Sequence, residues 1–191
     1  MPHANSKHPQ RLNPRLPLVF DTRGLGPGDD RRVTRNALAP AGLGVALVNV
    51  PEGAEMALDV VLEGVAEGVL VTATVRAPLV GECARCLDMF TSAAEVTFTE
   101  LFARDVSEDD ADGYVLVGDL LDLEPALRDA LVLELPLAPL CADDCPGLCS
   151  ECGVRLADAG PGHGHAQADA DGSPDGEPVT EDPQAADKPA D

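Results

Sequence analysis

The sequence predicts an α+β protein with a mainly antiparallel β-sheet or partial barrel, one packed helix, a C-terminal cysteine knuckle and disordered ends. Apolar and polar residues alternate through the middle of the chain, apolar residues recur at helical spacing later, and four cysteines crowd into 141–152. The length of 191 residues fits one core with extended ends, since domains commonly span about 100–150 residues. The predicted parts are a flexible arm at 1–15, a folded domain at 16–157 that includes the knuckle at 141–153, and a disordered acidic tail at 158–191.

The first predicted strand is the short apolar run 16–20. Glycines and a proline at 24–28 end it, and the basic stretch 30–36 shows no pattern that assigns its structure. From residue 45 onward the pattern becomes that of β-structure.

A hairpin is predicted from two runs of period two, 56–63 and 69–77, joined by a glycine turn. Alternation at 90–102 predicts a further strand. The acidic stretch 105–112 is expected to be a solvated loop, because so many like charges repel one another. A short apolar run resumes at 114–117.

A helix is predicted after Asp122, which is a candidate N-cap, with Pro125 in the first turn where no amide donor is needed. It should end before Pro136. Packing its apolar stripe on the sheet completes a two-layer core. The stripe is formed by Leu123, Ala126, Leu127, Ala130, Leu131 and Leu135.

The charge of the chain is strongly acidic, with 13 basic and 34 acidic residues and a net charge of −21. Such a field repels phosphate backbones and attracts basic proteins. Residues 1–40 differ, because seven basic and three acidic groups give a local +4 and leave −25 for the rest. Direct nucleic-acid contact is therefore expected in this region, although solvated charge is an equally simple explanation. The candidate contacts are Arg23, Arg31, Arg32 and Arg35.

The sequence predicts a cytoplasmic protein with no membrane partner. The first ten residues have no apolar core of a secretory signal, and no run of about 18 apolar residues offers a membrane span. Thiols stay reduced in the cytoplasm, so six cysteines in close pairs indicate metal or redox chemistry and not a disulfide framework.

A structural zinc site is predicted from Cys141, Cys145, Cys149 and Cys152, because four thiolates within a short loop can form a tetrahedral site at little cost in loop entropy. An alternative set remains open. In it, the second pair, Cys83 and Cys86, joins Cys149 and Cys152 across distant segments.

Catalysis has little support in the sequence. A thiol oxidoreductase using Cys83 and Cys86 would need a cysteine at a helix N-terminus, whereas this pair lies between two predicted strands. The four histidines fall in segments predicted to be disordered, where a general base cannot be positioned. We therefore expect no catalytic residues, and no function for the histidines, which are His3, His8, His163 and His165.

Several motifs occur together in order: 80–87 (VGECARCL), 118–125 (GDLLDLEP) and LPL at 135–137 before the cysteines, with PLVFDTR at 17–23. This combination resembles the actinobacterial branch of the YceD family of large ribosomal RNA accumulation proteins, over about residues 16–157. Ser150 departs from the family pattern, where proline is usual, and so does the tail after Leu156.

The resemblance implies a role in accumulation of large-subunit ribosomal RNA, a gene beside that of a zinc-binding large-subunit ribosomal protein, and no enzymatic activity. We therefore expect a ribosome biogenesis factor that binds a basic large-subunit ribosomal protein or a pre-ribosomal particle. Two alternatives are a zinc-stabilised module that binds ribosomal RNA directly and a thiol oxidoreductase.

Overall fold

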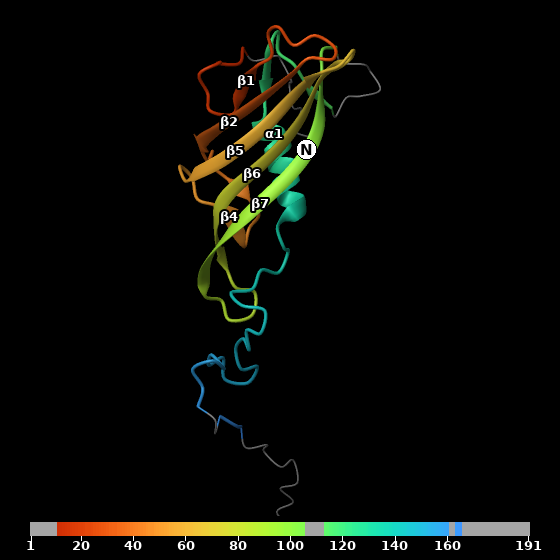
Figure 1. The fold of residues 1–191 in the computed structure, drawn as a ribbon. Helices are drawn as coiled ribbons and strands as arrows, with labels where there is room; N and C mark the ends of the chain where they lie inside the picture. The colour runs from red at the N-terminus through yellow and green to blue at the C-terminus, as the bar shows by residue number, and fades with distance from the viewer. Residues whose placement is uncertain (1–10, 106–112, 161–162, 166–191) are drawn as a thin grey trace, which may run out of the picture.

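The computed structural model describes residues 11–105, 113–160 and 163–165 (Figure 1). Most of the predicted flexible arm, most of the predicted acidic loop and the predicted tail from residue 166 lie outside the described residues.

Four long antiparallel strands form the body of the protein. Strand β6 (Gly68–Glu82) pairs with β5 (Glu55–Gly64) on one side and with β7 (Met89–Ala103) on the other, and β5 also pairs with β2 (Asp30–Leu38). Figure 1 shows these strands as one open, twisted sheet, which confirms the predicted antiparallel sheet and shows that it does not close into a barrel.

Short strands complete the architecture. In the main sheet, β4 (Val48–Val50) pairs with the end of β6, β3 (Leu43–Gly44) pairs with β4, and β8 (Tyr114–Val115) runs parallel to the end of β7. A separate two-stranded sheet joins β1 (Val19–Asp21) to β9 (Leu120–Asp122). Strand β1 thus begins three residues later, and ends one residue later, than the apolar run 16–20 that predicted it.

The predicted hairpin is confirmed as β5 and β6. Alternate residues of both strands point into the core, where their side chains are almost fully buried, and the residues between them face solvent. The solvent face carries cross-strand threonine pairs between β6 and β7, with Oγ atoms of Thr72 and Thr99 at 3.0 Å. The buried set is Met56, Leu58, Val60, Leu62, Val69, Val71, Ala73 and Val75.

Strand β2 occupies the basic stretch 30–36, for which no structure is predicted from the sequence. Arg35 of this strand packs over an aromatic ring of β1: its guanidinium lies 3.9 Å from the centroid of the Phe20 ring. Arg31 donates hydrogen bonds to the carbonyl oxygens of Asp21 and Arg23, both at 2.8 Å. The side chains of β2 therefore do alternate between the core and solvent. Half-buried arginine stems occupy two of the inward positions, so the apolar alternation typical of a strand is not visible in the sequence.

Helix α1 (Glu124–Glu134) packs behind the sheet (Figure 1), with its predicted apolar stripe toward the core. Its N-cap is Leu123, which offers no side-chain acceptor, so the expected cap at Asp122 lies one residue too early. Asp122 still accepts the Glu124 N–H through Oδ1 at 3.0 Å, which satisfies one of the free amides of the first turn.

Two leucines of α1 provide a matched test of this packing. Leu127 is 1% exposed, so Leu127→Ala should lower the free energy of unfolding by about 2–5 kcal/mol. Leu133 is 88% exposed, and Leu133→Ala should change it by less than about 0.5 kcal/mol. Urea denaturation of both variants checks the prediction, and equal losses would show that α1 does not pack as described.

Candidate functional site

The cysteines gather beyond the end of the sheet, where two distant segments meet. Cys83 and Cys86 lie in the turn between β6 and β7, and after α1 the chain returns along this turn. The Ala84 N–H donates to the Pro139 carbonyl at 2.8 Å, and the Leu148 N–H donates to the Arg85 carbonyl at 3.2 Å. Backbone hydrogen bonds therefore hold the post-helix segment against the hairpin turn.

The first cluster consists of Cys83, Cys86, Cys141 and Cys145, whose Sγ atoms all lie within 4.8 Å of one another. The Sγ atoms of Cys83 and Cys145 are 3.8 Å apart, and those of Cys86 and Cys141 are 3.7 Å apart. A tetrahedron of sulfurs around zinc at about 2.3 Å has edges of about 3.8 Å. The four thiols can therefore hold a zinc-sized metal ion.

The second cluster consists of Cys149, Cys152, His163 and His165, whose ligand atoms also lie within 4.8 Å of one another. The Cys149 Sγ lies 3.0 Å from Nε2 of His165, and the Cys152 Sγ lies 3.8 Å from Nε2 of His163. Two thiolates and two imidazoles are a common ligand set for structural zinc, so this cluster also suits a metal ion.

Neither predicted ligand set matches this grouping. The structure divides the expected C-terminal set between the two clusters, and it places Cys149 and Cys152 with histidines and not with Cys83 and Cys86. The sequence does not predict a role for the histidines, because the segment around them is rich in glycine, alanine and acidic residues. The signal that could have found them is the spacing from Cys152 to His163 and His165, a pair of imidazoles one residue apart shortly after a cysteine pair.

The first cluster favours ionised sulfur at one of its thiols. The Cys86 N–H, with further amides nearby, lowers the pKa of the Cys83 thiol to about 6, whereas burial and the neighbouring sulfurs raise the pKa of Cys86 to about 12. Amides directed at a sulfur stabilise the thiolate, which is the form that binds metal.

The second cluster also contains a thiol whose pKa is lowered by its neighbours. The nearby His163 ring, followed by the amides of Cys152 and Glu151, lowers the pKa of the Cys149 thiol to about 6. Each cluster therefore contains a sulfur whose surroundings favour the thiolate.

Comparison with known proteins places these clusters in a family. The family model "Large ribosomal RNA subunit accumulation protein YceD" matches residues 71–175, a range that contains both clusters. The chain belongs to the YceD family. The match extends past Leu156, where the resemblance of the motifs ended.

Mycobacterial proteins are among the relatives of this YceD chain. Uncharacterized proteins of Mycobacterium tuberculosis and Mycobacterium bovis are each 45% identical over 155 residues, which cover 77% of this chain and 74% of theirs. An uncharacterized protein of Mycobacterium leprae is 44% identical over the same length, covering 77% of this chain and 70% of its own. No solved structure gives a significant match.

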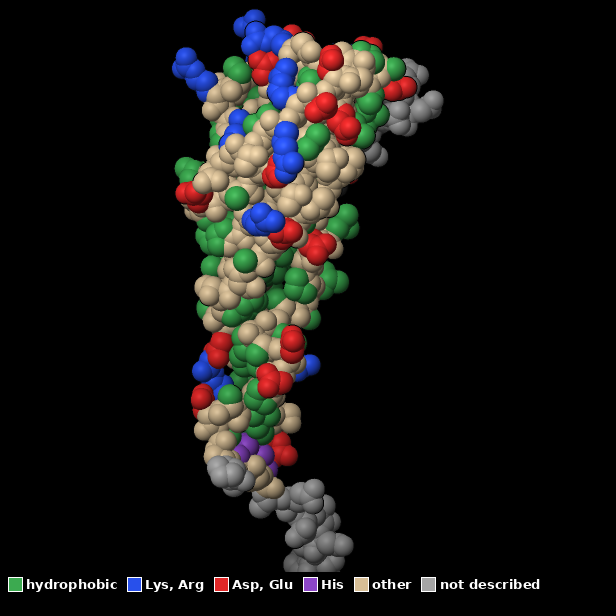
Figure 2. Space-filling view, in the orientation of Figure 1, with side chains coloured by type: hydrophobic (Ala, Val, Ile, Leu, Met, Phe, Trp, Pro, Cys, Tyr) green, Lys and Arg blue, Asp and Glu red, His purple; other side chains and the backbone are tan. Residues whose placement is uncertain are grey.

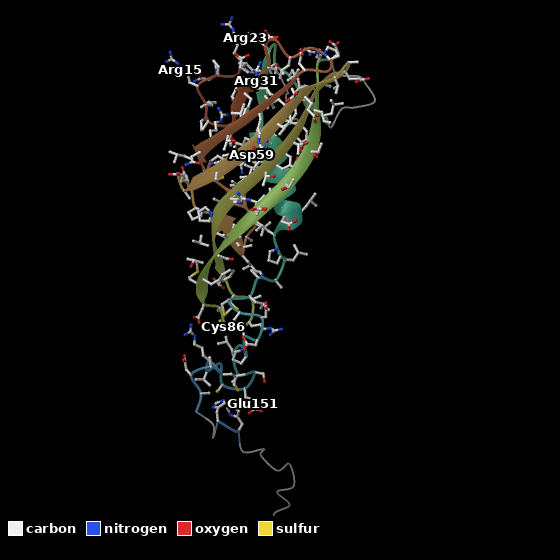
Figure 3. The ribbon with its side chains drawn as sticks, viewed as in Figure 1. Arg15, Arg23, Arg31, Asp59, Cys86 and Glu151 are labelled. Carbon is white, nitrogen blue, oxygen red and sulfur yellow. The ribbon has the colours of Figure 1, made fainter. Side chains whose placement is uncertain are left out.

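The four arginines predicted as nucleic-acid contacts all have partners within the YceD fold. Arg23 forms an ion pair with Asp21. Arg32 forms an ion pair with Asp59 across β2 and β5. The other two bind backbone carbonyls or cover Phe20, as described above. Figure 3 shows Arg23 and Arg31 at the end of the molecule opposite to Cys86, so the structure does not bring the basic residues to the cysteine clusters.

The position of Cys83 and Cys86 also bears on thiol chemistry. The pair occupies a hairpin turn and does not lie at a helix N-terminus, the position that activates the cysteine of thioredoxin-like enzymes.

None of the described helices is long and apolar enough to cross a membrane.

Gly147 allows a test of how the segment between Cys145 and Cys149 packs against the hairpin turn between β6 and β7. Its φ is +78°, and an added Cβ would lie 3.1 Å from the Arg85 carbonyl oxygen. Gly147→Ala should cost about 1–2 kcal/mol locally, so the neighbouring Leu148 amide should exchange its hydrogen about tenfold faster. Gly160→Ala is the control, because a Cβ there meets nothing within 4 Å. Unchanged exchange at Leu148 in Gly147→Ala would contradict the described contact.

Proposed function

We propose that this chain is a non-enzymatic ribosome biogenesis factor of the cytoplasm that supports accumulation of large-subunit ribosomal RNA. It does so by binding a basic large-subunit ribosomal protein or a pre-ribosomal particle. The family match over residues 71–175 is the observation that carries this proposal. The net charge of −21 supports the kind of partner, because an acidic surface attracts basic proteins and repels bare RNA.

A surface suited to a basic partner lies beside the first cysteine cluster. An open pocket there is lined by Asp88, Asp144, Asp158 and Arg155. The arginine is already engaged, since Arg155 forms ion pairs with Asp88 and Asp158. Within the described part of the chain, Asp144 and its neighbour Asp143 form no ion pair, so these two carboxylates are available to a lysine or arginine side chain of a partner.

Zinc in the first cluster would fix the position of these carboxylates. Cys141 and Cys145 flank Asp143 and Asp144 in sequence, and their metal partners Cys83 and Cys86 come from the hairpin turn. A zinc ion bound by all four thiolates joins the acidic loop to the sheet, and the affinity of the metal then contributes to the stability of this end of the fold.

Direct RNA binding through the N-terminal arginines has less support. Each of the four candidates is engaged within the fold, and contact with phosphate would have to compete with an ion pair, a carbonyl or an aromatic face. Figure 2 shows most arginines of the sheet face beside acidic side chains, so the face presents no continuous basic surface.

The partner surface can be tested by neutralising the free carboxylates. Asp143→Asn with Asp144→Asn should lower the affinity for a basic large-subunit ribosomal protein about fivefold, if each surface charge contributes about 0.5 kcal/mol. Affinity capture of tagged protein from growing cells, followed by titration with the captured ribosomal protein, measures the effect.

The matched control is Glu63→Gln with Glu67→Gln, which removes the same charge where β5 turns into β6. This control should leave the affinity nearly unchanged. An equal loss in both variants would show that total charge and not this surface attracts the partner. Capture of neither a large-subunit protein nor a large-subunit precursor would refute the proposed function.

The cellular role predicts a specific defect. Depletion of the protein should lower the amount of large-subunit ribosomal RNA relative to small-subunit RNA, and sucrose-gradient profiles should lose mature large subunits. Wild-type protein should restore the ratio, whereas Cys83→Ser with Cys86→Ser should not, because the acidic loop loses its anchor. An unchanged ratio after depletion would contradict a role in accumulation of large-subunit RNA.

A further inference from the structure

We propose that Cys149, Cys152, His163 and His165 bind a second zinc ion, and that this ion exchanges while the first cluster retains its metal. The inference goes beyond the proposed function, since it concerns a second metal site and its exchange and does not depend on which ribosomal partner is bound.

The backbone of the two cysteine turns is built in the same way. At the first turn, the Cys83 N–H donates to the Asp88 carbonyl at 2.8 Å, and the Leu87 N–H donates back to the Cys83 carbonyl at 2.9 Å. At the second turn, the Cys149 N–H donates to the Val154 carbonyl at 2.8 Å, and the Gly153 N–H donates back to Cys149 at 2.9 Å.

The residue that follows each cysteine pair adopts the same unusual backbone angle. Leu87 has φ of +62° and Gly153 has φ of +72°. A leucine in this region costs about 1–2 kcal/mol, so the turn is kept even where its residue does not favour it. In both turns this backbone places two sulfurs on one side of the loop. The second turn therefore repeats the construction of a turn whose sulfurs belong to a four-thiol site.

The histidines present their ring nitrogens to these sulfurs. The Nε2 atoms of His163 and His165 face Cys152 and Cys149, and the rings meet edge to face with centroids 4.9 Å apart. The other nitrogen of His165, Nδ1, lies 3.3 Å from a carboxylate oxygen of Glu151. A carboxylate at Nδ1 fixes the proton there and leaves the Nε2 lone pair for a metal, an arrangement typical of zinc-bound histidine.

The ligand set and the distances favour zinc. A tetrahedral ion with Zn–S of about 2.3 Å and Zn–N of about 2.0–2.1 Å has S···N edges of about 3.6 Å. The two S···N distances of the cluster, 3.0 and 3.8 Å, fall on either side of this value. Four protein ligands leave no open position, so the site is structural and not catalytic.

The two sites differ in how they are joined to the core. All ligands of the second site come from the single segment 149–165, and Cys152, His163 and His165 are exposed. In the first site Cys141 is exposed and Cys86 half-buried, but Cys83 and Cys145 are only 0% and 6% exposed, and the four ligands join the hairpin turn to the segment after α1. A chelator can therefore reach the second ion directly, whereas removal of the first requires opening of the contact between two parts of the fold.

Metal content tests whether the second site exists. Purified full-length protein should contain two zinc ions per chain by elemental analysis, and His163→Ala with His165→Ala should contain one. The matched control, His3→Ala with His8→Ala, changes the other two histidines and should retain two. One zinc per wild-type chain, or two in the His163 and His165 variant, would overturn the second site.

Cobalt substitution gives a readout that does not depend on the yield of folded variants. Two cobalt ions per wild-type chain should produce absorption from both an all-sulfur and a mixed sulfur–nitrogen tetrahedral site. The His163 and His165 variant should retain only the all-sulfur spectrum. If wild type and variant give the same absorption spectrum per bound cobalt ion, ligation by the histidines is refuted.

Chelator competition tests exchange. With excess 4-(2-pyridylazo)resorcinol, zinc should leave wild-type protein in two phases of equal amplitude, the first at least tenfold faster, and the fast phase should be absent from the histidine variant. Amide protection of Val71 and Ala73 in β6 should persist through the fast phase. A single release phase, or loss of this protection with the first ion, would refute independent exchange.

Discussion

The pairing of β6 with β7 is the constraint on which the other features of the structure depend. The two strands pair along their whole length, from Gly68 opposite Ala103 to Glu82 opposite Met89. Glycine is required at two points of this pair: a Cβ on Gly68 would lie 2.0 Å from the Phe102 carbonyl oxygen, and one on Gly81 would lie 2.9 Å from the Phe90 ring. A slip of one residue would turn the buried faces outward, so the register also fixes where the cysteine turn emerges.

Arginine has two roles in this protein that charge counting does not separate. On β2 the side chains of Arg31 and Arg35 pack over β1 and hold its backbone, while on the solvent face Arg32 and Arg76 pair with carboxylates of neighbouring strands. The local excess of positive charge near the N-terminus therefore contributes to folding in an otherwise acidic chain. Among the described residues, the acidic side chains that lack such partners carry negative charge, which supports the proposal of a basic protein partner over a nucleic acid.

The sequence was sufficient for the hairpin of β5 and β6 and for α1, because their apolar residues follow periods of two and 3.6 without interruption. It was insufficient for β2, where arginine stems replace aliphatic side chains on the inner face. The cysteine grouping in the structure differs from the predicted sets for another reason. Loop entropy favours ligands close in sequence, but the hairpin and the packing of α1 bring Cys83 and Cys86 beside Cys141 and Cys145. Composition predicts no function for the histidines because it describes a segment on average, whereas the structure places His163 and His165 beside two particular cysteines.

The chemistry of the two clusters suggests how metal binding relates to the proposed partner surface. Zinc held by four thiolates has a net formal charge of about −2, whereas zinc held by two thiolates and two neutral imidazoles is about neutral. Loading the first cluster would therefore add negative charge beside Asp143 and Asp144 and strengthen the attraction for a basic partner. Loading the second would change the order of 149–165 with little change of charge. Under both proposals, exchange of the second ion would alter the shape of the proposed partner surface, while the charge of the first ion would keep the electrostatic attraction constant.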